Sequence, residues 1–172
     1  MKYQPIFEDE FICAQIKWHK PIPLSENWAE FSDWNKYNHE NIYFYKFVAV
    51  RGNNPNPIIN LIYIGFSTRP IYERLQDKDH LAKQQKVKKD NPGFRFYVSA
   101  GELLNPTTKN KKHLKDYETL LIYSHKNTNF KKLINISNAI RHNVNKSIII
   151  ENSGYLKDRM YKKVSYGLFH FI

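Results

Sequence analysis

The stretch IYFYKFVAV, Ile42 to Val50, and the stretch IINLIYIGF, Ile58 to Phe66, decide the fold of this chain of 172 residues. Both runs are rich in β-branched and aromatic residues, which favour strands, and both are apolar almost throughout. The segment RGNNPNP, residues 51–57, joins them with the Gly, Asn and Pro residues of a turn. The two runs therefore predict a β-hairpin whose strands are covered on both faces.

Helices and one more strand are expected after this hairpin. Ser67 or Thr68 can cap a helix that has Pro70 in its first turn. Alternating apolar and polar residues predict a half-buried strand from Phe94 to Ala100. Two further helices are expected, at His80 to Lys89 and at Lys111 to His125. The helical spacing of apolar residues and the turn residues that follow predict both.

The flanks of this region carry weaker signals. A helix of about ten residues capped by Ser25 is expected. Strands are expected at Phe7 to Trp18, Ser147 to Glu151 and Val164 to Phe171. The sequence thus predicts an α/β chain of the α+β kind, with a small, mainly antiparallel three-stranded central sheet flanked by helices. The core spans residues 41–136, between an N-terminal extension, residues 1–40, and a β-rich C-terminal extension, residues 137–172, packed on the core.

The composition narrows the classes of partner and compartment. Lys and Arg number 27 against 16 Asp and Glu, a net charge of +11 that favours polyanionic partners such as nucleic acid. Cys13 is the single cysteine, which excludes an intrachain disulfide framework and fits a reducing compartment, the cytoplasm. No apolar run approaches the roughly 18 residues that span a bilayer, so no membrane association is expected.

Two charged residues stand at positions where apolar residues are expected. Glu118 lies four residues after Leu114 and three before Leu121, within the apolar stripe of its helix. Arg74 repeats the pattern between Ile71 and Leu75. A buried charge is costly unless something pairs with it, so these are candidate site residues. The alternative is a salt bridge or a snorkelling side chain at the edge of the core.

The tripeptide Tyr63-Ile64-Gly65, with Ile42-Tyr43 on the preceding strand, resembles the paired motifs of the GIY-YIG nuclease family. In order along the chain, Arg74 in Glu73-Arg74-Leu75, then His80, Glu118 and Asn135 match further family positions, over about residues 41–135. The ordered set is far more specific than one tripeptide.

The resemblance implies a role for each of these residues. Tyr43 deprotonates or orients the attacking water, helped by Tyr63 or His80, and Arg74 grips the scissile phosphate. Glu118 holds one divalent ion, Mg²⁺ or Mn²⁺, in a site of hard oxygen ligands. Substrate-binding positions are expected along the same surface, at Asn135, Gly65, Ser67, Arg69, Lys83 and Lys86.

Three departures from the family pattern leave alternatives open. Asn41 stands where the family has Gly, the loop between the strands is long, and Arg74 falls one residue late. Arg69 is therefore a rival for the arginine role, and Tyr72 competes with the displaced His80.

The function implied is a divalent-metal-dependent endonuclease, on DNA rather than RNA, of a restriction or defence type. Its alternative is a non-catalytic nucleic-acid-binding module on a degenerate GIY-YIG fold. Double-stranded DNA is the expected partner, and cutting both strands with one active centre implies a homodimer or sequential nicks. Lysines on and beside the second and third expected helices are expected to contact the phosphates of the nucleic acid. They are Lys83, Lys86, Lys88, Lys89, Lys109, Lys111, Lys112 and Lys115.

Overall fold

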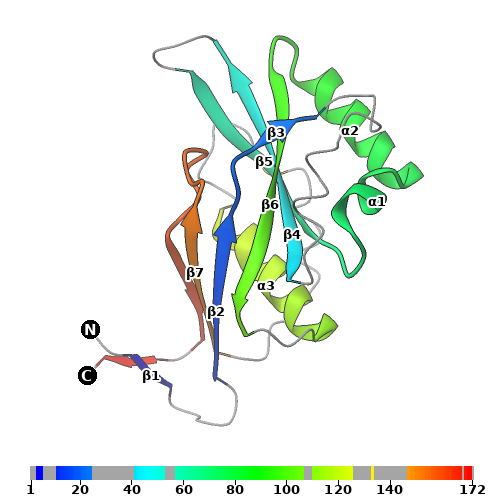
Figure 1. Cartoon of the computed structure of the whole chain (residues 1–172). Helices are drawn as coiled ribbons and strands as arrows, with labels where there is room; N and C mark the ends of the chain where they lie inside the picture. Colours follow the sequence, from blue (N-terminus) through cyan, green and yellow to red (C-terminus); the bar gives the residue numbers. More distant parts are fainter. Residues whose placement is uncertain are drawn as a thin grey trace.

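The computed structural model describes residues 3–5, 11–24, 41–52, 57–106, 110–125, 133, 147–167 and 169–171. Its helices lie in the middle of the chain, with strands before, between and after them (Figure 1). In order they are β1 (Tyr3–Pro5), β2 (Phe11–Trp18), β3 (Ile22–Pro23), β4 (Ile42–Arg51), β5 (Ile58–Phe66), α1 (Ile71–Leu75), α2 (Lys78–Asp90), β6 (Arg95–Asn105), α3 (Lys111–Ser124), β7 (Ser147–Gly154), β8 (Lys163–Tyr166) and β9 (Phe169–Phe171).

The predicted hairpin is confirmed as β4 and β5, which pair antiparallel. Eight successive residues of β4 are buried, as expected for a strand covered on both faces. A bulge interrupts the pairing, because Phe47 faces Tyr63 while the next residue, Val48, faces Leu61. The extra residue, Ile62, shifts which side chains of β5 share a face with those of β4.

The expected three-stranded sheet is wrong. Seven strands form one curled, mixed sheet in the order β5-β4-β6-β2-β7-β8, with β3 also paired to β6, while β1 and β9 form a separate two-stranded sheet. The strand β6 pairs with β4 along one edge and with β2 and β3 along the other, so strands from outside the expected core complete the sheet. Leaving that edge unpaired would expose a row of backbone groups, and β2 satisfies them.

The expected helices after the hairpin are found as α1, α2 and α3. Asn110 caps α3, since its side-chain oxygen accepts a hydrogen bond of 3.0 Å from the Lys112 backbone N–H. The helix expected after Ser25 and the candidate Asn135 lie outside the described residues. Within the described part of the chain, no helix combines the length and apolar character needed to cross a membrane.

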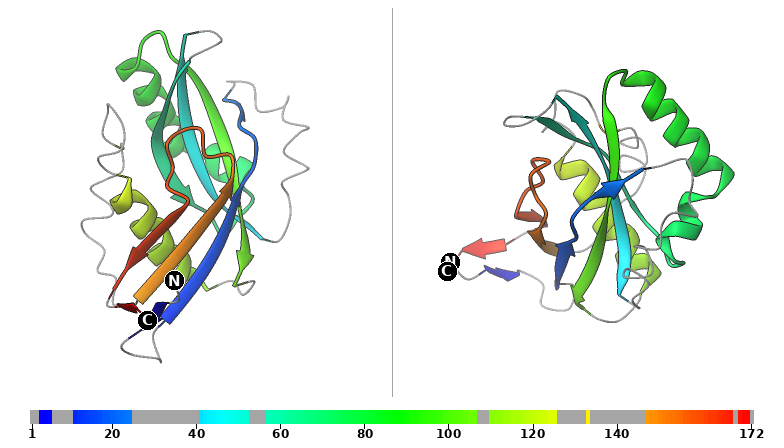
Figure 2. Two further views of the ribbon diagram at one scale, coloured as in Figure 1. Left: turned by 90° about the vertical axis from the view of Figure 1, so that its left-hand side faces the viewer. Right: turned by 45° about the horizontal axis from the view of Figure 1, so that its top comes forward.

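Each face of the sheet has its own hydrophobic cluster. Alternate residues of β2, among them Ala14, Ile16 and Trp18, pack in the first cluster with α3. The second cluster joins β4 and β5 to α1 and α2, through Phe47, Ile71 and other buried residues. The helix α3 contacts both edge strands, β5 and β8, so the sheet curls around it (Figure 2).

A buried ion pair joins the C-terminal strands to the hairpin. The Lys46 ammonium lies 2.9 Å from Asp158 Oδ2, and both side chains are 0% exposed. Lys46 also donates to the Tyr155 carbonyl at 2.8 Å and lies 4.6 Å from the ring centroid of Trp18. Burial lowers the pKa of Lys46. The carboxylate of Asp158 acts in the opposite direction, because it favours the charged ammonium. The pair ties the segment between β7 and β8 to the middle of the sheet.

Acid is expected to destabilise the fold through two buried histidines. His125 donates from Nδ1 to the Leu121 carbonyl and accepts the Tyr161 backbone N–H at Nε2, so its neutral form is fixed. Burial lowers the pKa of His125, and it lowers that of His80 to about 4. Because the unfolded chain takes up these protons first, near pH 6.5, stability is full above that value and falls as the pH drops below it.

The measurement is the urea-unfolding free energy at pH 7.5 and pH 5.5. Each histidine contributes at most about 1.4 kcal/mol to the loss at pH 5.5. The loss should shrink in His125→Gln and remain in His113→Gln, whose histidine lies half-buried in the first turn of α3. An equal loss in both variants would contradict the assignment to His125.

Candidate active site

Two tyrosines stack side by side at the centre of the hairpin. The rings of Tyr45 on β4 and Tyr63 on β5 have centroids 5.8 Å apart. Gly65 is the β5 residue that pairs with Tyr45, and it leaves room for the ring. A Cβ atom at Gly65 would lie 2.6 Å from Tyr45 Cζ and 2.7 Å from Tyr63 Cε1. The glycine of the Tyr-Ile-Gly motif thus has a physical reason: both phenols occupy the space of its missing side chain.

Tyr43, the tyrosine expected in the site, lies elsewhere. It belongs to the first hydrophobic cluster with Phe44 and Tyr117, whereas Tyr45 and Tyr63 belong to the second. The pairing of β4 with β6 shifts between Ile42 and Phe44, at Tyr43 itself. Sequence reasoning missed Tyr45. If Tyr45, and not Tyr43, is the tyrosine of the first tripeptide, that tripeptide is Tyr43-Phe44-Tyr45. Tyr43 then stands where the family has Gly.

His80 reaches both phenols from α2. Its Nε2 lies 2.9 Å from the Tyr45 hydroxyl, and its ring stands edge-on to Tyr45 and Tyr63, with centroids 5.6 and 5.8 Å away. The side chain is 0% exposed, and Nδ1 has no hydrogen-bond partner among the described residues. The competing Tyr72 donates instead to Glu73, at 3.1 Å. The structure therefore brings His80 to the phenols.

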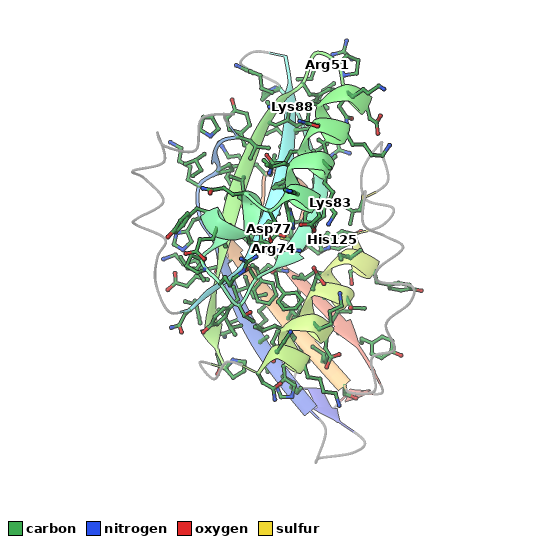
Figure 3. The ribbon with its side chains drawn as sticks, turned by 90° about the vertical axis from the view of Figure 1, so that its right-hand side faces the viewer. Arg51, Arg74, Asp77, Lys83, Lys88 and His125 are labelled. Atoms are coloured by element: carbon green, nitrogen blue, oxygen red, sulfur yellow. The ribbon has the colours of Figure 1, made fainter. Side chains whose placement is uncertain are left out.

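Arg74 and Arg69 meet at one carboxylate. Asp77 Oδ2 accepts hydrogen bonds of 2.5 Å from Arg74 Nη1 and from Arg69 Nη2. Arg69 is placed by the turn after β5, where its backbone N–H donates to Ser67 Oγ. Arg74, Asp77 and Lys83 gather where α1 and α2 approach α3 (Figure 3). Both rival arginines thus reach the same small region.

Glu118 approaches from α3, across the edge of the sheet. Its side chain is 8% exposed, and Oε2 accepts a hydrogen bond of 2.6 Å from Lys115. Burial raises the pKa of Glu118, while Lys115 and a hydrogen bond from the Phe66 backbone favour its charged form. The charge of Glu118 also raises the pKa values of Tyr45 and Tyr63.

These groups meet because β5 is an edge strand. Among the described residues no strand lies beyond β5, so α3 packs against this edge, and Glu118 meets the Phe66 backbone at the end of β5. We call Tyr45, Tyr63, Arg74, His80 and Glu118 the hairpin-edge cluster. Lys83 lies beside it, 6.0 Å from the centroid of the Tyr63 ring. Lys86 instead pairs with Asp90 further along α2, at 3.0 Å, and is 66% exposed.

The phenols of the cluster are neutral at neutral pH. Burial raises the pKa of Tyr63 to about 12 and that of Tyr45 well above its usual value of 10. Burial, and then the charges of Arg74 and Lys83, lower the pKa of His80 to about 4. No cationic pocket ionises the tyrosines, so they can act by positioning and by relaying a proton.

Glu118 suits a single hard cation. Among the described residues, no group of three or more His, Cys, Asp or Glu side chains is placed to hold a metal ion. A site with one buried carboxylate fits an ion that keeps most of its ligands as water, as Mg²⁺ does. Lys115 holds Oε2 of Glu118, so an ion bound at that oxygen would compete with Lys115.

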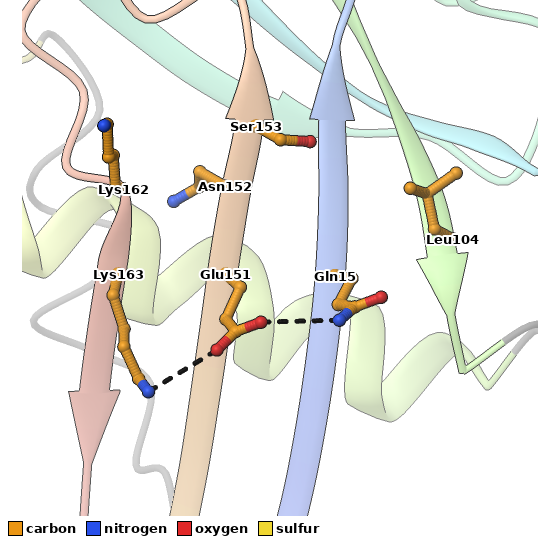
Figure 4. A pocket seen from close by; sticks show the side chains of 7 residues that line it. All are labelled: Gln15, Leu104, Glu151, Asn152, Ser153, Lys162 and Lys163. Carbon is orange, nitrogen blue, oxygen red and sulfur yellow. Dashed lines mark hydrogen bonds and ion pairs between the residues drawn. The ribbon is translucent and has the colours of Figure 1, made fainter. Parts of the chain in front are cut away.

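A hollow of about 430 Å³ lies on the sheet, over β2, β6, β7 and β8 (Figure 4). Its Glu151 carboxylate bonds to Gln15 on one side and lies 3.4 Å from Lys163 on the other. Asn152 is held by Trp18 and by the Tyr161 carbonyl. These polar groups bind one another across neighbouring strands. The hollow is therefore a weaker candidate for an active site than the hairpin edge.

Comparisons of the chain with models of protein families, with curated proteins and with solved structures found no match. The resemblance to the GIY-YIG family stays a prediction from the sequence motifs.

Proposed function

We propose that this chain is a divalent-metal-dependent endonuclease of the GIY-YIG type, hydrolysing phosphodiester bonds in double-stranded DNA. The observation that supports it is the convergence in the hairpin-edge cluster of two phenols, an imidazole, a guanidinium and a carboxylate from distant parts of the chain. The net charge of +11 suits a polyanionic substrate. The single cysteine supports a reducing compartment such as the cytoplasm.

In this proposal each group has a distinct task. Arg74 donates its planar fork of N–H groups to the scissile phosphate and stabilises the charge that develops on it. Tyr63 and Tyr45 orient the attacking water through their hydroxyl groups. Glu118 would hold a divalent ion, which would supply positive charge against the negative charge that develops in the reaction.

The proton of the attacking water follows the hydrogen bond between Tyr45 and His80. The water passes its proton to the Tyr45 oxygen as the Tyr45 hydroxyl proton moves to His80 Nε2, 2.9 Å away. His80 is a weak base in the empty site, with a pKa of about 4. An incoming phosphate brings negative charge that favours the imidazolium, so substrate raises this pKa. The water oxygen then bonds to phosphorus, the ester bond breaks, and the leaving oxygen takes a proton from solvent.

A second function, a module that binds nucleic acid without cutting it, is favoured by one observation. Each of the charged groups of the cluster already has an internal partner: Arg74 has Asp77 and Asp79, and Glu118 has Lys115. A site held in this way can bind phosphate through its surface lysines yet never assemble for catalysis.

Incubation of supercoiled plasmid with Mg²⁺ or Mn²⁺ separates the two functions. The nuclease nicks the plasmid, chelator stops it, and Glu118→Gln lowers the rate about 100-fold because the ion loses its protein ligand. Salt-sensitive binding without nicking, at any concentration of either ion, would support the binding module and refute the enzyme.

Two neighbouring tyrosines provide a matched pair of variants for the same assay. Both Tyr43 and Tyr45 are buried, at 5% and 1% exposure, and each can be changed to Phe by loss of one hydroxyl. Tyr45→Phe is expected to lower the nicking rate about 100-fold, since the proton path is broken. Tyr43→Phe should stay within a few-fold of the unchanged protein. The reverse order would return the role to Tyr43.

A further inference from the structure

The cations beside the hairpin-edge cluster are held by two acidic residues of different character. Asp77 precedes α2, is 28% exposed, and holds Arg74 and Arg69 through the same oxygen at 2.5 Å. Asp79, in the first turn of α2, is 52% exposed and makes longer contacts. Asp77 therefore fixes the position of Arg74, whereas Asp79 is the partner that another anion can replace.

Asp79 contacts Arg74 in the geometry of a bound anion. Its two oxygens face the two terminal nitrogens of the guanidinium, Oδ1 at 3.4 Å from Nη1 and Oδ2 at 3.4 Å from Nη2. Two parallel N–H···O contacts are how arginine grips a phosphate as well as a carboxylate. Oδ2 also accepts a hydrogen bond of 3.3 Å from Lys83. One carboxylate thus engages both Arg74 of the cluster and Lys83 beside it.

We propose that Asp79 is a built-in competitor for the substrate phosphate, which must displace it from Arg74 and Lys83. The inference rests on the proposed function, because it takes Arg74 as the residue that grips a phosphate of nucleic acid. Replacing Asp79 by a phosphate costs little free energy, because the side chains of these ion pairs are partly exposed and each pair is weak in water. Asp79 lowers the affinity for any phosphodiester backbone. Its charge also acts on His80, where it favours the imidazolium, so the test measures binding rather than cutting.

Asp90 provides a matched control on the same helix. It pairs with Lys86 four residues before it, as Asp79 pairs with Lys83 four residues after it, and the two carboxylates are 50% and 52% exposed. Asp79→Asn and Asp90→Asn make the same change in net charge. Any difference between them therefore measures the local effect at Arg74 and Lys83.

The experiment measures binding of a fluorescent duplex DNA by anisotropy, in chelator so that no cutting occurs, at several salt concentrations. Asp79→Asn is expected to bind about threefold to tenfold more tightly than Asp90→Asn, with a steeper salt dependence, because it removes a carboxylate partner from both Arg74 and Lys83, whereas Asp90→Asn removes one from Lys86. In an Arg74→Gln background most of this gain should disappear. Equal affinities for the two Asn variants, or weaker binding by Asp79→Asn, would overturn the inference.

The outcomes also separate this inference from the proposed function. If the unchanged protein cuts DNA but the two Asn variants bind alike, Asp79 is no competitor and the nuclease proposal stands. If nothing cuts under any metal condition while Asp79→Asn binds more tightly, the competitor is supported and the nuclease is refuted. If no variant binds DNA and the unchanged protein cuts none with either ion, both proposals are refuted.

Discussion

Replacing Gly65 by alanine is expected to lower the rate of DNA cutting by about 1,000-fold, because the new methyl group must push aside both phenols of the site. The added Cβ would lie 2.6 Å from Tyr45 Cζ and 2.7 Å from the Tyr45 hydroxyl oxygen. Since atoms at that distance overlap, the rings must move by a large fraction of an ångström. The Tyr45 hydroxyl then loses its alignment with His80 Nε2.

The measurement is the single-turnover cutting rate, with DNA binding in chelator as a second readout. Binding should change little, since the three atoms nearest the added Cβ belong to Tyr45 and Tyr63 rather than to a cation. Gly101→Ala is the control: its Cβ would lie 2.9 Å from Phe44 Cβ and from Trp18 Cζ3, in the core rather than the site. That variant should lose stability but keep its cutting rate per folded molecule. Full cutting by Gly65→Ala would contradict the placement of the phenols.

Replacing Lys46 by methionine is expected to destabilise the fold by about 3–5 kcal/mol, because it leaves the Asp158 carboxylate buried without its cation. Both side chains of the pair are 0% exposed, and Lys46 also bonds the Tyr155 carbonyl. The variant therefore loses two buried partners at once. Urea unfolding measured by circular dichroism gives the free energy directly.

Lys163→Met is the matched control for that experiment. Lys163 lies 3.4 Å from Glu151, with the two side chains 42% and 45% exposed, so its loss should cost less than about 1 kcal/mol. Adding Asp158→Asn to Lys46→Met should recover part of the lost stability by removing the stranded charge. A small effect of Lys46→Met alone would show that the carboxylate takes up a proton or finds water at little cost.

Much of the fold follows from local patterns, and the part that does not follow is long-range. The hairpin is predictable because its strands are continuous apolar runs joined by a turn. The strands β2 and β7 also have strand-like residues, yet nothing local reveals that Phe11 pairs with Ser147 in parallel. The strands of a parallel pair are not joined by a short turn, so no turn sequence indicates that they pair. The prediction of a three-stranded sheet failed for that reason.

The site shows a similar division. The order of residues along the chain located Tyr63, Arg74, His80 and Glu118, which the structure brings together. Tyr45 was missed because Tyr43 and Tyr45 are both plausible strand tyrosines. The bulges in β4 and its neighbours decide which of them faces Tyr63. Such one-residue shifts in register depend on packing across strands and leave no trace in a single sequence.

The parallel pair of β2 and β7 sets the order in which a growing chain can complete its structure. As the ribosome releases the polypeptide from its N-terminal end, β2 can join β6 once residue 105 has emerged, but its other edge waits for residues 147–154. During that interval the nascent protein presents an open row of amide and carbonyl groups beside apolar side chains. Such an edge is prone to join other chains. Translation arrested before β7 should therefore yield fragments that aggregate or require chaperones.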